Sequence, residues 1–194
     1  MSLTLARLGI VAGSFPIAAG GDFESIATVT VGSGGASSIE FTSIGTDWQH
    51  LQIRGVFRES RALTSTAAMQ IRVNGDTGSN YTYHWLYGTG SSAAAGAGAS
   101  QSIGAVTDIP RNSETSSAFA AAVIDILDYD NTSKNKTIRI FGGYEGNNSN
   151  GIVMVNSSLW MSTSAITSIL LRPSGGSGDF VQHTTAALFG IKAP

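Results

Sequence analysis

The chain has 194 residues, 42% of them hydrophobic and only 12% charged, with 24 glycines and a net charge of −2 at neutral pH. This length suits one domain with a sizeable core. The chain has no Lys or Arg run for phosphates, no apolar run of the ~20 residues that span a bilayer, and no cysteine, so we expect no nucleic-acid partner, no membrane partner and no thiolate metal site.

Residues 1–21 predict an extended arm that precedes a single β domain at 22–194. Glycines and Pro16 interrupt a regular helix there, yet the arm is rich in apolar side chains. Apolar residues outside a sandwich need a covering surface, so we expect contact with a neighbouring subunit or a capsid. The arm folding back as an extra strand and a cleaved signal peptide remain alternatives. The predicted partner-binding residues are Leu3, Leu5, Arg7, Leu8, Ile10 and Phe15.

Alternating apolar residues predict the first strands. Residues 23–31 and 39–44 alternate on either side of Gly32-Ser33-Gly34-Gly35, which predicts a hairpin. Residues 48–57 predict a further strand, in which Gly55 is a candidate bulge position.

Residues 69–87 predict a two-stranded unit around a turn. Met69, Ile71 and Val73 alternate with polar residues, and residues 74–78 contain the Asn, Asp and Gly typical of turns. The second arm places four aromatic residues on one face, which favours a core face. A sugar-stacking platform is the alternative for these residues, namely Tyr81, Tyr83, Trp85 and Tyr87.

The second half of the chain predicts more strands. The Gly/Ala/Ser composition of residues 88–102 predicts a long mobile loop, with a helix over 93–99 as the alternative. Residues 119–129 suit a helix or a strand, and their β-branched centre favours the strand. Further strands are expected at 103–107, 137–141, 152–161, 165–171 and 180–191. About ten short strands without a confident helix predict an all-β antiparallel β-sandwich, with a jelly roll as its specific form.

Chemically reactive constellations are not evident in the sequence. The three histidines lack a second ligand at metal-binding spacing, and Asp125, Asp128 and Asp130 lack the pattern of a calcium loop. Serine is too abundant for a Ser, His and Asp to indicate a triad. We therefore expect no enzyme, no catalytic residue, no metal and no cofactor.

Several motifs together resemble a recurrent family of small virion structural proteins of tailed bacteriophages, including cyanophages. They are Phe23-Glu24-Ser25-Ile26-Ala27-Thr28-Val29-Thr30-Val31-Gly32, His50-Leu51-Gln52-Ile53-Arg54-Gly55, Val73-Asn74-Gly75-Asp76-Thr77-Gly78-Ser79-Asn80-Tyr81, Ser158-Leu159-Trp160 and Leu188-Phe189-Gly190-Ile191-Lys192. The resemblance spans residues 23–192 and implies a β-sandwich on a virion, made in the host cytoplasm. It suggests a capsid decoration (cement) protein that binds the major capsid protein or other virion proteins, or alternatively the receptor-binding module of a tail fibre.

The edges of a sandwich predict self-association. Edge strands must be paired or covered, and closed symmetry is a common solution. Because few charges are available to protect those edges, we expect a homo-oligomer, specifically a homotrimer.

Overall fold

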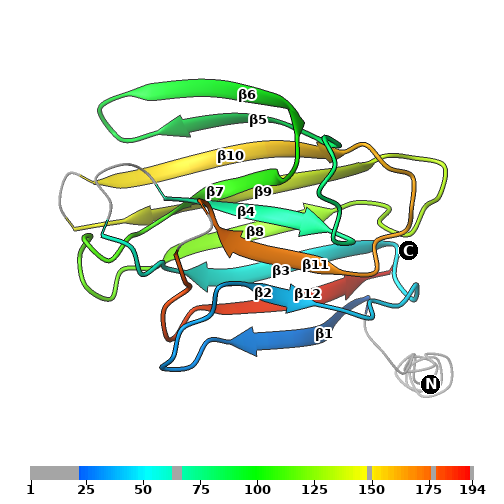
Figure 1. Cartoon of the computed structure of the whole chain (residues 1–194), viewed down its shortest axis with the longest axis horizontal. Coiled ribbons are helices and arrows are strands. Elements are labelled where there is room, and N and C mark those ends of the chain that lie inside the picture. Colours follow the sequence, from blue (N-terminus) through cyan, green and yellow to red (C-terminus); the bar gives the residue numbers. More distant parts are fainter. Residues whose placement is uncertain (1–21, 63–66, 148–149, 176–177, 193–194) are drawn as a thin grey trace, which may run out of the picture.

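The computed structural model describes residues 22–62, 67–147, 150–175 and 178–192, which form two antiparallel sheets and no helix (Figure 1). The eight-stranded sheet contains, in spatial order, β1 (Phe23–Thr30), β12 (Thr185–Ile191), β3 (His50–Phe57), β8 (Ala120–Ile126), β9 (Lys136–Glu145), β10 (Gly151–Trp160), β5 (Tyr81–Gly88) and β6 (Ala93–Gln101). The four-stranded sheet contains β2 (Ile39–Phe41), β11 (Ile169–Pro173), β4 (Ala67–Val73) and β7 (Gly104–Ile109). The predicted all-β antiparallel sandwich is therefore confirmed.

The core lies between the two sheets and follows the period of two in each strand. In β4, Met69, Ile71 and Val73 are fully buried, while the residues between them are partly exposed. In β3, Leu51 and Ile53 are also fully buried and face the same core. Since alternate side chains of a strand point to opposite faces, each strand contributes one apolar row to the sandwich.

The predicted pairing of neighbouring strands is wrong in two places. β1 does not form a hairpin with β2: β1 pairs with β12, whereas β2 pairs with β11 in the other sheet. Likewise β4 pairs with β11 and β7, and β5 pairs with β10 and β6. The connections after β1 and β4 therefore cross between the sheets, and β1 and β2 find their partners, β12 and β11, far away in the sequence.

After β4, the chain passes from the four-stranded to the eight-stranded sheet through the turn at residues 74–78. Asn74 and Gly75 have positive φ angles of 50° and 65°, which reverse the chain. Tyr81 then enters the core from the other sheet, and its hydroxyl accepts a hydrogen bond from the backbone N–H of Val73 at 3.1 Å. This bond links the ends of two strands that lie in different sheets.

The Gly/Ala-rich segment is a strand, so the predicted mobile loop at 88–102 is wrong. β6 pairs with β5 from Ala93 to Gln101, and two glycines in it lie beneath aromatic rings. A Cβ on Gly96 would lie 2.3 Å from the ring of Trp85, and one on Gly98 would lie 2.5 Å from the ring of Tyr83. Aromatic side chains that cover glycines of a neighbouring strand compensate for the missing side chains there.

Gly55 is not a bulge, because its register with the flanking strands is continuous. Its role is steric: a Cβ there would lie 2.5 Å from the ring of Phe57 and 2.5 Å from the carbonyl oxygen of Thr185. The strand predictions at 48–57, 103–107, 119–129 and 137–141 are confirmed as β3, β7, β8 and β9.

The unequal size of the two sheets leaves part of the larger one uncovered. β7 is the edge of the small sheet and packs against β9 and β10. The hairpin of β5 and β6 extends beyond it, at the top of Figure 1.

Candidate assembly surface

One face of the eight-stranded sheet points away from the four-stranded sheet, and its centre is apolar. The strand register aligns Val56 of β3 with Ala121, Gly143 and Val153, and the adjacent row aligns Val123 with Phe141, Val155 and Leu86. We call the large side chains in these two rows the outer patch: Val56, Val123, Phe141, Val153, Val155 and Leu86. Apart from Val123, which is partly exposed, their exposed fractions lie between 42% and 58%.

The outer patch is hollowed rather than flat. An open depression of about 820 Å³ lies over β3, β8, β9 and β10. Its middle contains Ala121 and Gly143, which are much smaller than Val56 and Val153 at either side. Gly143 cannot be replaced without displacing the backbone, because a Cβ there would lie 2.1 Å from the carbonyl oxygen of Ile152.

Charged and polar groups lie at the margins of the outer patch. Arg54 lies at the side nearer β1, where its Nε donates to Gln52 at 2.6 Å and its guanidinium lies 5.2 Å from the ring centre of Phe23. Glu145 is exposed at the opposite side of the depression. The next row of the same face is polar and pairs Asp125 with Arg139. A large exposed apolar area with a polar rim is typical of a surface that contacts another protein.

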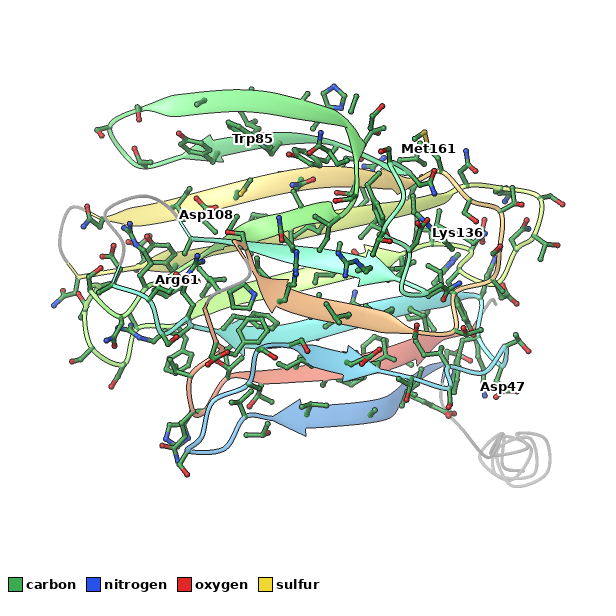
Figure 2. All side chains as sticks on the ribbon, viewed as in Figure 1. Asp47, Arg61, Trp85, Asp108, Lys136 and Met161 are labelled. Atoms are coloured by element: carbon green, nitrogen blue, oxygen red, sulfur yellow. The ribbon has the colours of Figure 1, made fainter. Side chains whose placement is uncertain are left out.

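The four aromatic residues predicted to share one face of a strand differ in burial. Tyr81 is fully buried, and burial raises the pKa of its hydroxyl, so it belongs to the core. Tyr83, Trp85 and Tyr87 are half-buried on the face of β5 opposite to the outer patch. Trp85, labelled in Figure 2, stacks on Tyr87 with ring centres 5.2 Å apart and planes inclined by 19°.

The predicted partner-binding residues of the arm, Leu3, Leu5, Arg7, Leu8, Ile10 and Phe15, lie outside the described residues. Their role therefore stays a prediction.

Two polar residues, the buried Arg58 and the partly exposed Asp128, hold loops of the fold. Arg58 donates from Nη1 to the carbonyl oxygens of Thr115 and Ala118, both at 2.8 Å, and burial lowers the pKa of its guanidinium. Asp128 pairs with Lys134 at 2.6 Å and accepts from Gln49, so hydrogen bonding to Lys134 lowers its pKa. Among the described residues, no group of three or more His, Asp or Glu side chains is placed to hold a metal ion.

The outer patch was not predicted from the sequence, although a signal for it exists. Residues 152–155 are four consecutive apolar residues, and Ile140 is directly followed by Phe141. In a strand with period two, such runs place apolar side chains on both faces. One of these faces packs in the core here, and the other is the outer patch.

Searches of protein families, of curated proteins and of solved structures found no match to this chain. In the described part of the chain, no helix has the length and hydrophobicity needed to cross a bilayer.

Proposed function

We propose that this chain is a structural protein of a bacteriophage virion, specifically a capsid decoration protein that binds the outer shell and links neighbouring capsomers. The observation that carries the proposal is the outer patch, an exposed apolar surface on a sheet whose other face is already in the core. Such a surface is used for contact with another protein. The sequence resemblance to small virion proteins supports the same function.

The strand order supports a jelly roll as the architecture. Without the two hairpins β5–β6 and β9–β10, eight strands remain. Numbered in chain order, their spatial arrangement is 1-8-3-6 in one sheet and 2-7-4-5 in the other. This is the order of two interleaved Greek keys, which occur in viral capsid proteins and in lectins. The hairpins would then be additions that widen one sheet and form part of the outer patch.

The receptor-binding module of a tail fibre is the second candidate. Tyr83, Trp85 and Tyr87 retain some exposure, and aromatic rings can stack on sugar rings. Trp85 and Tyr83, however, already cover the glycines of β6, which explains their position without a ligand. We therefore favour the capsid decoration function over the receptor-binding module.

Assembly into a homotrimer is part of the proposal. Among the described residues, β1 and β6 are the edge strands of the large sheet, and β6 carries no charged residue to discourage pairing with another chain. Closed symmetry would cover such edges. The other partner would be the major capsid protein.

Cryo-electron microscopy of the phage particle tests the function. We expect density for the sandwich on the outside of the capsid, with the outer patch in contact with protein. Density for this chain only on the tail would overturn the decoration function and favour the receptor-binding module. Absence of the chain from purified particles would overturn both.

A further inference from the structure

We propose that the outer patch of one copy binds the N-terminal segment, residues 1–21, of a neighbouring copy. The inference rests on the proposed function, because it names the partner of the same surface. The outer patch is then the binding site for a defined segment of the chain and not a general assembly surface.

The shape of the outer patch argues against two outer patches packing face to face. Protein interfaces reach the packing density of protein interiors where the two surfaces are complementary in shape. Two copies of the same depression would leave a void of about twice 820 Å³ between them. A single extended segment with large side chains can instead enter the depression and fill it.

The composition of residues 1–21 matches the depression. Besides Met1, the segment contains seven large apolar residues: Leu3, Leu5, Leu8, Ile10, Val11, Phe15 and Ile17. Its only charged side chain is that of Arg7, and the depression has the exposed carboxylate of Glu145 at one side. The rim of the apolar hollow thus carries one anion, Glu145, with which Arg7 would pair, and one cation, Arg54, at the opposite side.

The attachment point of the segment favours a neighbouring copy over the same chain. Phe23 lies at one end of the edge strand β1, whereas Thr30 at the other end shares a row with Val56 of the outer patch. To reach its own patch, the segment would have to reverse its direction at Phe23 and run back over β12, past Gln52 and Arg54, to Val56 on β3. An extended chain of 21 residues spans up to about 70 Å, enough to reach a molecule that lies beside the β1 edge.

Exchange of the segment between copies also explains how a closed assembly could form. Each copy would donate its segment to the next copy and accept one from the previous copy. Such head-to-tail contacts form a ring when the rotation closes. A trimer is the ring expected from the sequence.

Engineered cysteines test the inference in the full-length protein, which has none of its own. ¹⁵N-labelled Leu8→Cys protein is mixed with unlabelled Val153→Cys protein, the mixture is oxidised mildly, and cross-linked peptides are identified by mass spectrometry. Leu127→Cys replaces Val153→Cys in the control, because Leu127 is similarly exposed but follows β8 outside the outer patch. Each single variant is also oxidised alone to measure random pairing.

We expect mixed-isotope peptides that join positions 8 and 153, in about tenfold excess over those that join positions 8 and 127, because docking raises the local concentration of the two thiols. Equal, low yields for both pairs would overturn the inference. A link found only within single chains of the double variant Leu8→Cys/Val153→Cys would also overturn it, since the segment would then fold back. Failure here, combined with capsid density for this chain, would leave the decoration function intact.

Discussion

Lys136 is a fully buried lysine at the start of β9, and at the residue scale it explains how two loops are held together (Figure 2). Its ammonium group donates to the carbonyl oxygens of Asn131 at 2.5 Å, Lys134 at 2.8 Å and Thr163 at 3.1 Å. The first two belong to the turn before β9, and the third belongs to the connection after β10. Burial lowers the pKa of Lys136, but three acceptors surround the charge.

The Lys136→Met variant is expected to lose about 3 kcal/mol of unfolding free energy, because an apolar side chain leaves three part-buried carbonyl groups without their donor. Lys134→Met is the matched control: the side chain of Lys134 is 60% exposed, and its ion pair with Asp128 is a surface pair. Urea unfolding of both variants measures the difference. Equal stability of the two variants would contradict the role given to Lys136.

Asp76 holds the turn between the two sheets through three donors. Its carboxylate accepts from Trp160 Nε1 at 2.6 Å, from Asn80 Nδ2 at 2.9 Å and from the backbone N–H of Gly78 at 2.7 Å. The hydrogen bond from Trp160 is the main cause that lowers the pKa of Asp76. A carboxyl group with a lowered folded-state pKa stabilises the fold above its unfolded-state pKa of about 3.9, and this contribution is lost as the pH falls through the folded-state value.

Replacing Asp76 with Asn should therefore make part of the stability independent of pH. We expect the wild type to exceed Asp76→Asn by about 1–2 kcal/mol at pH 7, because the charged acceptor is lost. The gap should shrink as the pH falls below about 4. Urea unfolding from pH 3 to pH 7 measures it, and a gap that stays constant across this range would show that the carboxylate charge is not the cause.

At the element scale, β6 shows a strand formed against its own composition. Gly and Ala disfavour strands in isolation. The segment is nevertheless held as a strand because Trp85 and Tyr83 of β5 lie directly over Gly96 and Gly98. The cause is thus a cross-strand contact that the local sequence of β6 does not contain.

Gly96→Val tests this contact, because strand propensity predicts a gain in stability for this variant, whereas packing predicts a loss. Valine favours strands, but its side chain would displace the ring of Trp85. We expect a loss of about 1–3 kcal/mol and faster hydrogen exchange in β6, as for other overpacked sites. Ala97→Val is the control, because Ala97 is exposed on the opposite face. A stabilised Gly96→Val variant would contradict the account.

The positions of most strands could be predicted from the sequence, but their partners could not. The alternation in residues 69–73 marks β4 because burial of one face is a local property of the pattern. The partner of β1, in contrast, is β12 near the other end of the described chain. Turn residues such as Asn74 and Gly75 reverse the chain equally well within a sheet or between two sheets. The sequence therefore could not show whether the chain forms a hairpin at residues 32–35 and 74–78 or crosses there to the other sheet.

The outer patch could not be predicted from the local sequence pattern either. An apolar run such as residues 152–155 indicates two apolar faces but does not say whether both are covered. Coverage depends on which face of the strand packs on the four-stranded sheet, because only the opposite face is left without a second layer. Val153 and Phe141 therefore appear as a candidate surface only when the strands are assembled.

In the assembled molecule, the outer patch is an exposed apolar surface that the four-stranded sheet does not cover. Phe141 is its central side chain and is 58% exposed. The variant Phe141→Asp is expected to remain folded, since substitutions at exposed positions usually change stability by about 0.5 kcal/mol or less. It should, however, place a charge where the partner segment would bind. Leu127→Asp changes an exposed apolar residue outside the outer patch and is the matched control.

The most direct measurement is the mass in solution of the wild type, Phe141→Asp and Leu127→Asp, by light scattering after gel filtration at micromolar concentration. We predict three times the mass of one 20.0 kDa chain for the wild type and for Leu127→Asp, and a folded 20.0 kDa monomer for Phe141→Asp. The same mass for Phe141→Asp as for the wild type would contradict the claim that the outer patch is the assembly surface.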